Sequence, residues 1–164
     1  QQEEEHVARR IDYLNDPDAP QANSLVPSVN VAVRDEEGRL LLIRRSDNGN
    51  WALPGGAMDL GERLAEAGVR ETLEETGIRC EITGLVGIYT DPGHVIHYTS
   101  NDEVRQEFSV VLAARPVAGE PTPSSESTRV LWVEPDQVDR YRIHPSMRLR
   151  ITHALADRGT PHIG

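Results

Sequence analysis

Residues 56–78 read GAMDLGERLAEAGVRETLEETGI, and most of this stretch predicts a helix. Five of its residues are glutamate, and three of these, Glu71, Glu74 and Glu75, fall within five consecutive positions. On a helix, side chains three and four residues apart are neighbours, so the three carboxylates would share one side. Each pair of like charges destabilises an isolated helix by about 0.2–0.5 kcal/mol. Such a cluster therefore requires a compensating group or a function.

The helix is predicted over residues 60–76. Opposite the glutamates, a stripe of four residues is expected to face the core: Ala65, Val69, Leu73 and Thr76. Gly77 suits the left-handed conformation that ends many helices, so the helix would stop directly after the glutamates. At the other end, Asp59 and Glu62 have the spacing of a capping box.

Two interpretations of the acidic cluster compete. The first is a solvated acidic face with no further role. The second is a site for a hard divalent cation such as Mg²⁺ or Mn²⁺, because these ions take oxygen ligands and convergent carboxylates favour their binding. Three features favour the metal site. Arg70 can orient one carboxylate, Gly77 ends the helix beside the cluster, and the glycines of LPGG (residues 53–56) let the backbone approach an ion or a phosphate.

The fixed positions in this stretch resemble the signature of the Nudix hydrolases. The matching residues are Gly56, Glu62, Arg70, Glu71, Glu74, Glu75, Gly77 and Ile78. Thr72 stands where that family usually has an aliphatic residue, which affects no catalytic position. The preceding segments LLLIRR (40–45) and WALPGG (51–56) are also similar to the strand and loop before the family signature. The resemblance spans residues 27–157 and leaves the N-terminal segment outside.

Nudix hydrolases typically use Mg²⁺ or Mn²⁺ to hydrolyse a nucleoside diphosphate linked to another group. The metal ligands implied by the resemblance are the carbonyl oxygen of Gly56 and the side chains of Glu71, Glu74 and Glu75. Arg70 would orient a carboxylate, and Glu62 would have a structural role. The general base stays open between the signature helix and a later loop. On that loop Glu126 would complete the metal site or act as the base, with an ordinary loop role as the alternative; Glu120 is a weaker candidate.

The segment YTDPGHVIHYTSNDEVRQEF (89–108) is rich in groups that bind nucleotides. Its candidate substrate-binding residues are His94, His97, Tyr98, Arg105 and Gln106. Arg44 and Arg45 are alternatives for a phosphate contact, and one of them must point away because adjacent strand residues face opposite sides. For each residue taken singly, an ordinary structural role is the alternative. Pro92 and Tyr98 lie near positions that distinguish Nudix subfamilies, which favours ADP-ribose or nucleotide sugars over nucleoside triphosphates.

Strand patterns surround the signature helix. Strands are predicted at residues 28–34, 39–45, 81–90, 107–115 and 129–133, with the first two paired as a hairpin through the turn DEEG. A Pro/Ser-rich loop over residues 116–128 lies between the last two of these strands, and a closing helix is predicted over residues 146–158. Strands interleaved with helices indicate an α/β (α+β) domain, here a Nudix-type α/β/α sandwich with a mixed sheet between helices.

The N-terminal segment predicts a separate helix. Val7, Ile11 and Leu14 have helical spacing within residues 3–14, and a Pro-rich link follows. The chain is therefore divided into three parts: the N-terminal helix and link (1–26), a Nudix hydrolase domain (27–158) and a C-terminal tail (159–164).

Composition limits the classes of molecule that the chain is expected to bind. The chain has 164 residues and a formal net charge of −10, which argues against binding nucleic acid or an anionic membrane. A phosphorylated small molecule remains compatible, because a divalent cation reverses the local sign of charge. The single cysteine, Cys80, cannot form an internal disulfide and is expected to be a buried thiol, with a reactive nucleophile as the alternative. A cytoplasmic setting is expected, and dimers are common in this fold.

The function predicted from the sequence is a Mg²⁺-dependent pyrophosphohydrolase acting on a nucleotide substrate. The main alternative is a Nudix-fold binding or sensor domain without catalysis, and a structural or interaction domain would require the signature to be a coincidence. The complete carboxylate set favours the hydrolase.

Overall fold

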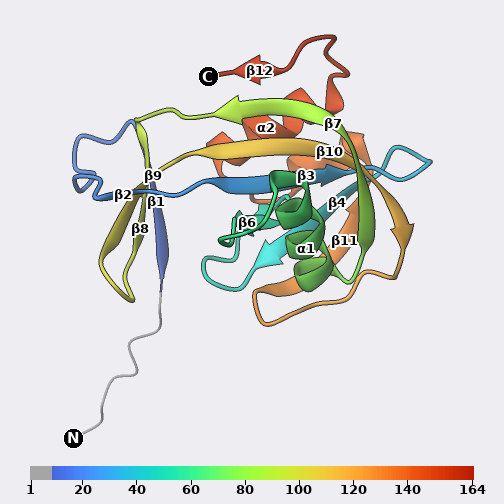
Figure 1. Cartoon of the computed structure of the whole chain (residues 1–164), viewed down its shortest axis with the longest axis horizontal. Coiled ribbons are helices and arrows are strands. Elements are labelled where there is room, and N and C mark those ends of the chain that lie inside the picture. The colour runs from blue at the N-terminus through green and yellow to red at the C-terminus, as the bar shows by residue number, and fades with distance from the viewer. Residues whose placement is uncertain (1–8) are drawn as a thin grey trace, which may run out of the picture.

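The computed structural model of this chain describes residues 9–164 (Figure 1). Its elements in chain order are β1 (Arg10–Leu14), β2 (Ser24–Leu25), β3 (Ser28–Val33), β4 (Leu40–Arg45), β5 (Trp51–Ala52), β6 (Gly55–Ala57), α1 (Leu64–Thr76), β7 (Arg79–Tyr89), β8 (His94–Tyr98), β9 (Glu103–Gln106), β10 (Ser109–Ala118), β11 (Ser127–Val133), the 3₁₀ helix η1 (Pro135–Arg140), α2 (Pro145–Leu155) and β12 (His162–Ile163). The predicted strands and closing helix are confirmed, with ends shifted by a few residues.

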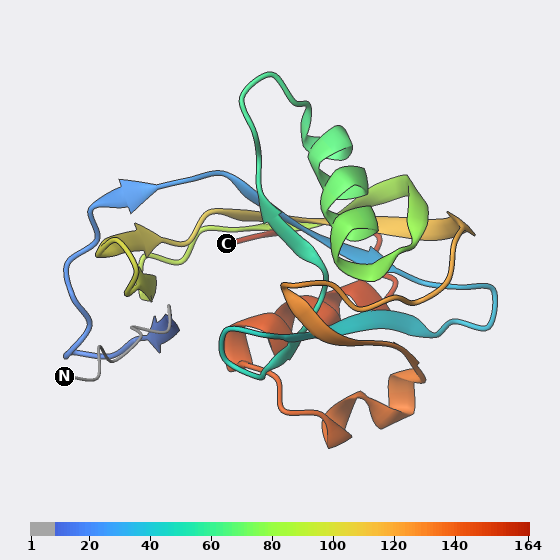
Figure 2. The same ribbon diagram turned by 90° about the horizontal axis from the view of Figure 1, so that it is seen from below.

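Two helices enclose a mixed sheet, which confirms the predicted α/β/α sandwich. The central sheet has the order β12-β7-β10-β3-β6, in which β10 is parallel to β3 and antiparallel to β7. Figure 2 shows α1 on one face of this sheet and α2 on the other, where the small sheet β11-β4-β5 also lies. No helix within residues 9–164 has the length and apolar character needed to cross a membrane.

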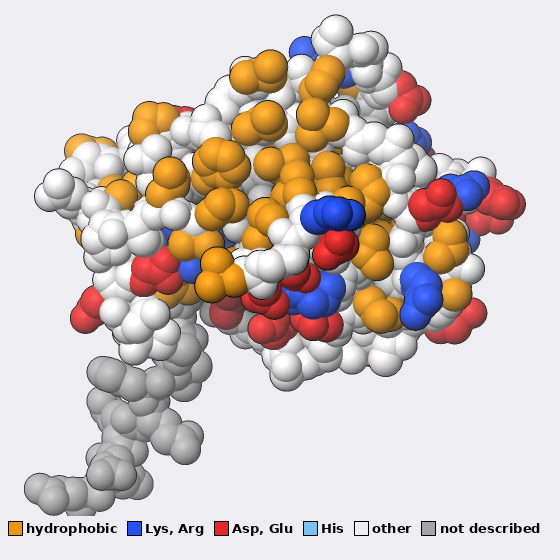
Figure 3. Space-filling view, viewed as in Figure 1, with side chains coloured by type: hydrophobic (Ala, Val, Ile, Leu, Met, Phe, Trp, Pro, Cys, Tyr) orange, Lys and Arg blue, Asp and Glu red, His pale blue; other side chains and the backbone are white. Residues whose placement is uncertain are grey.

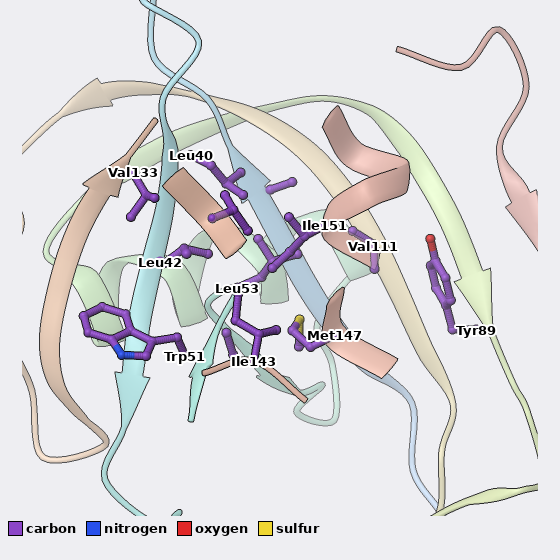
Figure 4. Packing of buried hydrophobic residues seen from close by; sticks show 13 residues of the cluster. Leu40, Leu42, Trp51, Leu53, Tyr89, Val111, Val133, Ile143, Met147 and Ile151 are labelled. Atoms are coloured by element: carbon purple, nitrogen blue, oxygen red, sulfur yellow. The ribbon is translucent and has the colours of Figure 1, made fainter. Parts of the chain in front are cut away.

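The core has one hydrophobic cluster on each face of the central sheet. The cluster on the α2 side joins strands β4 and β10 to the closing helix, and Figure 4 shows Leu42, Leu53 and Ile151 meeting there. The cluster on the α1 side includes Ala67 and the buried thiol of Cys80. Each cluster fixes one helix against the sheet, because burial of apolar surface is the main driving force of packing.

The predicted core stripe of α1 is wrong for two of its four residues, whereas Thr76 is fully buried and Val69 packs against the core. Ala65 is exposed, Leu73 is 41% exposed, and the buried residues of the helix are Ala67, Gly68, Glu71, Thr72, Glu75 and Thr76. The helix packs through small residues: a Cβ built on Gly68 would lie 3.1 Å from a methyl group of Val31. This close approach turns two glutamates inward. Hydrophobic side chains, Leu73 among the exposed ones, gather on the face that carries α1 and β7 (Figure 3).

The predicted hairpin of residues 28–34 and 39–45 is also wrong. β3 lies between β10 and β6 in the central sheet, whereas β4 lies between β11 and β5 in the small sheet. Within the described part of the chain, these two segments share a single bridge, Arg34 to Leu40, beside the turn. Both edges of each strand are taken by other strands, so the turn joins two sheets.

The predicted N-terminal helix is wrong for its described part. Residues 3–8 lie outside the described residues, and Arg10–Leu14 form strand β1, which pairs antiparallel with β8. β2 pairs with β9, giving a sheet of order β1-β8-β9-β2 at one end of the molecule (Figure 1). The tail also adds a strand, because β12 pairs with β7. Tertiary pairing therefore overrides the helical spacing of this segment.

Candidate active site

Three carboxylates meet beside the inner face of α1. Glu71 and Glu75 lie on the helix, Glu126 lies just before β11, and one oxygen of each falls within 4.8 Å of the others. Glu71 and Glu75 are buried, and Glu126 is exposed. The inward turn of α1 therefore brings two signature glutamates to the loop that the sequence singled out.

Strand β6 approaches this helix through its two glycines. The Gly55 N–H donates a hydrogen bond of 3.1 Å to Glu75 Oε2. A Cβ built on Gly56 would lie 2.7 Å from the Glu71 carboxyl carbon, closer than real Cβ contacts. No side chain fits at position 56 without displacing Glu71, so glycine there allows the backbone to reach the carboxylates.

Serines place the Glu126 loop. The Glu126 N–H donates to Ser124 Oγ at 3.2 Å, and the Glu126 carbonyl accepts from the Ser46 N–H at 3.0 Å. Ser127 Oγ donates to the backbone carbonyl of Glu75, which ties this loop to α1. Sequence reasoning named Glu126 on this loop but missed Ser127; side-chain-to-backbone bonding by serine next to a candidate ligand was the available signal.

Arg70 orients the signature carboxylates. It forms two hydrogen bonds of 2.7 and 2.8 Å to Glu62 and one of 2.9 Å to Glu71. The Arg70 hydrogen bonds lower the pKa of Glu62 to about 2. Glu74 lies outside the three-carboxylate group: its side chain is 58% exposed and contacts Arg70 at 3.2 Å. Its role as a metal ligand stays a prediction.

The positive charge near the two buried carboxylates is too small to offset the effect of burial on their pKa values. Burial raises the pKa of Glu75 to about 8, although the Gly55 N–H opposes the shift, and the charges of Glu71 and Glu126 add to it. Burial also raises the pKa of Glu71 despite its bond to Arg70. Clustered oxygen ligands without a matching cation suit a hard divalent ion, so the residues present fit such a metal.

The carboxylates line a cavity of about 420 Å³. Of the predicted substrate-binding residues, three also line it: Arg45, Tyr98 and Arg105. Arg45 forms an ion pair of 2.7 Å with Asp47. Arg105 places its guanidinium carbon 4.8 Å from the centre of the Tyr98 ring.

The other four predicted substrate-binding residues do not line this cavity. His94 is 2% exposed and its Nε2 contacts Asp12 at 3.0 Å, so its ring is held inside the fold. His97 contacts the exposed Asp102, and Gln106 pairs in the ladder of β9. Arg44 reaches instead toward the backbone of the turn after β4, because strand neighbours face opposite sides.

Sequence reasoning missed several cavity residues. They are Arg10 and Asp12 of β1, Glu107 before β10, His144 before α2, and Arg150 within α2. The alternation of Arg10 and Asp12 in RIDYL was a strand-type signal, hidden by the helical spacing of the apolar residues.

Comparisons with known proteins identify the family. A family model described as NUDIX domain matches residues 24–154, so this chain belongs to the Nudix family. It is a hydrolase of phosphorus-containing acid anhydrides, a pyrophosphohydrolase, and this family generally uses a divalent metal and small nucleotide substrates.

Relatives carry several names. A MutT-like protein of Streptomyces ambofaciens is 38% identical over 153 residues, covering 92% of this chain and 90% of that one. A putative 8-oxo-dGTP diphosphatase of Bacillus subtilis is 32% identical over 113 residues, 69% of each chain. An ADP-ribose pyrophosphatase of Methanocaldococcus jannaschii is 42% identical over 81 residues, 44% of this chain and 48% of that one. In fold, this chain is similar to a Nudix hydrolase structure from Nitrosomonas europaea, with TM-score 0.66, 21% identity, and coverage of 84% and 93%.

Proposed function

We propose that this Nudix hydrolase requires Mg²⁺, with Mn²⁺ as a substitute, and cleaves the diphosphate of a nucleoside diphosphate linked to another group. The observation that carries the proposal is the meeting of Glu71, Glu75 and Glu126 in a partly buried cluster. These three side chains would hold the ion, with Glu74 and the carbonyl oxygen of Gly56 as further ligands. When bound, a divalent ion neutralises charge on the phosphoryl group and lowers the pKa of a water molecule.

The chain's own groups would position the reactants. Arg70 holds Glu71 through a 2.9 Å bond, so this carboxylate keeps one orientation. Arg45 lines the cavity with its charge balanced by Asp47, and its Nη1, which forms no hydrogen bond within residues 9–164, offers one to a phosphate oxygen of the substrate. In-line attack by water on a diphosphate depends mainly on such positioning and on charge stabilisation.

Glu126 is the residue that we propose as general base. Glu71 accepts a hydrogen bond from Arg70, and Glu75 accepts one from the Gly55 N–H. The described part of the chain provides no hydrogen-bond donor to the Glu126 carboxylate, whose backbone alone is held by the loop. With one carboxylate oxygen offered to the ion, the other oxygen of Glu126 would be free to take a proton from the attacking water.

The favoured substrates are ADP-ribose or nucleotide sugars rather than nucleoside triphosphates. The relatives carry names from both classes, so those names do not separate them. Support comes from Pro92 and Tyr98, which lie near positions that distinguish Nudix subfamilies.

A turnover panel tests the function. Release of phosphate-bearing products is measured with Mg²⁺ or Mn²⁺ for ADP-ribose, nucleotide sugars and nucleoside triphosphates. Glu75→Gln is expected to lower kcat by about 10³-fold or more, because charge stabilisation by a bound metal contributes several kcal/mol. Glu74→Gln is expected to abolish turnover, because it removes a proposed metal ligand. It is expected to keep the fold, because the Glu74 side chain is exposed.

Glu66→Gln is the matched control, since Glu66 lies on the same helix with its side chain 57% exposed. It is expected to keep normal turnover. Metal-independent turnover, or near-normal turnover of Glu75→Gln, would refute the metal site. Equal turnover of triphosphates and ADP-ribose would refute the substrate preference alone.

Two further expectations from the sequence stay proposals. A homodimer is checked by light scattering, which separates the mass of one chain from that of two. A cytoplasmic setting rests on the single cysteine, Cys80, and is checked by fractionation of the producing cell.

A further inference from the structure

The end of the cavity away from the signature helix is built partly by strand β1. Arg10 and Asp12 of this strand line the same cavity as Glu71 and Glu75. Both lie outside residues 24–154, the part of the chain that matches the family domain. The cavity wall is thus completed by a segment that the common domain does not include.

Pairing with β8 fixes the direction of these side chains. In the antiparallel ladder Arg10 lies opposite Tyr98, and Asp12 lies opposite Ile96. Directly paired residues point to the same side of a sheet, so all four share one face. All four line the cavity, so that face is its wall.

Arg10 is held rigidly on this wall. Its Nε and Nη2 each donate a hydrogen bond of 3.1 Å to the Asp12 carboxylate. Asp12 is itself fixed by His94, whose Nε2 lies 3.0 Å from Oδ1, and its side chain is only 8% exposed. A two-pronged contact of this kind restricts the guanidinium to one plane, while Nη1 forms no hydrogen bond within residues 9–164.

The neighbouring strand β9 repeats the arrangement. Arg105 donates two bonds of 2.9 Å to Glu103, and its guanidinium lies over the Tyr98 ring. Each arginine on this wall is matched by one carboxylate, so the wall has little net charge for an anion. Flat guanidinium and phenol groups instead offer a stacking surface and hydrogen-bond donors to a planar, neutral group.

The two ends of the cavity lie on different elements. Glu71 and Glu75 lie on α1, whereas Arg10 and Asp12 lie on β1, in the sheet at the other end of the molecule (Figure 1). A substrate with phosphates at the first end would therefore place a different chemical group at the second.

We propose that Arg10, held by Asp12 beside Tyr98, binds the nucleobase of the substrate and makes β1 a specificity-determining element. This inference rests on the proposed function, because it assumes that the phosphates bind at the carboxylate end. Arg10 contacts the base through Nη1, and the Tyr98–Arg105 stack lies beside the ring plane.

Binding of ligands that share a sugar phosphate and differ in the base tests the assignment. Nucleoside 5′-monophosphates of the four common bases and ribose 5-phosphate are titrated by NMR without metal. Wild-type protein is expected to bind the preferred nucleotide about tenfold or more tightly than ribose 5-phosphate. Arg10→Gln is expected to remove most of this preference, because hydrogen bonds from charged donors contribute about that factor.

Arg9→Gln is the matched control, since Arg9 is the exposed neighbour of Arg10. It is expected to keep the preference within about twofold. A double variant, Arg10→Gln with Asp12→Asn, removes both charges together and guards against unfolding caused by an unpaired buried carboxylate. It is expected to melt close to wild type and to lack the preference.

The outcomes are separable. An unchanged preference in Arg10→Gln and the double variant overturns the proposal. Equal weakening of both ligands also overturns it, because Arg10 would then bind phosphate or sugar. Absence of metal-dependent turnover in wild-type protein refutes the proposed function, whereas these binding ratios refute only the role of Arg10.

Discussion

The inner face of α1 and the wall of β1 both bury acidic side chains, but with opposite results. Glu75 is 4% exposed, and burial raises its pKa to about 8. The Asp12 side chain is 8% exposed, and burial acts in the same direction, yet the hydrogen bond from His94 and the charge of Arg10 hold its pKa well below the usual range. The partner, rather than burial alone, decides the charge state.

The β1 wall carries its own counter-charge for Asp12, whereas the α1 face provides little for Glu75. At β1 the chain supplies its own cation, so the wall is rigid before any ligand binds. At α1 the two buried glutamates share one arginine contact, which goes to Glu71. Burying these two carboxylates with so little positive charge costs stability and brings no compensating contact within the fold. Such a cost is typical of a functional site, here one that would bind an ion.

The largest expected effect concerns pH and the α1 face. Without metal, the folded-state pKa of Glu75 is about 8 against an ordinary 4.5. A raised pKa means that its contribution to stability is full below pH 4.5 and is lost as the pH rises to 8, by up to about 1.4 kcal/mol per pKa unit. Urea unfolding in chelator at pH 5.5 and 8.5 is expected to show this loss, and excess Mg²⁺ to reduce it.

Glu75→Gln is expected to flatten this dependence, because the amide does not titrate. Glu66→Gln, on the exposed side of α1, is expected to leave it unchanged. The same slope in wild type and Glu75→Gln would show that Glu75 is charged in the metal-free fold.

At β1 the expected pH dependence has the opposite sign. The lowered pKa of Asp12 means that its contribution to stability is present above its ordinary value of 3.8 and is lost as the pH falls below it. Asp12→Asn is expected to cost about 2 kcal/mol at pH 7, because Arg10 loses its charged partner, and less at pH 3. Urea unfolding at both pH values measures the difference.

Asp139→Asn is the control, because Asp139 pairs with Arg148 while 95% exposed. Its effect is expected to be within about 0.5 kcal/mol at both pH values. An Asp12→Asn deficit that grows toward pH 3 would contradict the assigned charge state.

Gly56→Ala tests the close approach of β6 to the carboxylates. The added Cβ would lie 2.7 Å from the Glu71 carboxyl group, and the flexible end of that side chain must move. Turnover is expected to fall by about 10-fold to 100-fold with little loss of stability, because small misplacements at a reacting site have such effects. Gly84→Ala, with no atom within 4 Å of its Cβ, is expected to keep full turnover.

Much of the fold follows from local pattern. The strand segments, the signature helix and the closing helix were predicted because each has a strong period or a clear end, such as Gly77 with its φ of 74°. The predicted hairpin is wrong because β3 and β4 each pair with other strands along both edges. Strand β1 was not predicted because its partner β8 lies about eighty residues away, and no local pattern encodes that pairing.

The candidate site was likewise only partly predictable from the sequence. Fixed spacing within 56–78 and the loop glutamate were sufficient to nominate Glu71, Glu75 and Glu126, which the structure brings together. The inward orientation was not predictable from hydrophobicity, because the buried face of α1 consists of small and polar residues. Its packing depends on Gly68 against Val31, a contact between elements.

The smallest expected effect tests that orientation. Leu73 is 41% exposed, so Leu73→Gln is expected to change the free energy of unfolding by less than about 0.5 kcal/mol. Ala67 is fully buried, and Ala67→Gln is expected to destabilise the protein by about 1–3 kcal/mol through overpacking. Denaturant unfolding at pH 7 compares them. A larger destabilisation by Leu73→Gln than by Ala67→Gln would show that the hydrophobic stripe is the packed face of α1. Glu71 and Glu75 would then face outward, and the metal site would lose its physical basis.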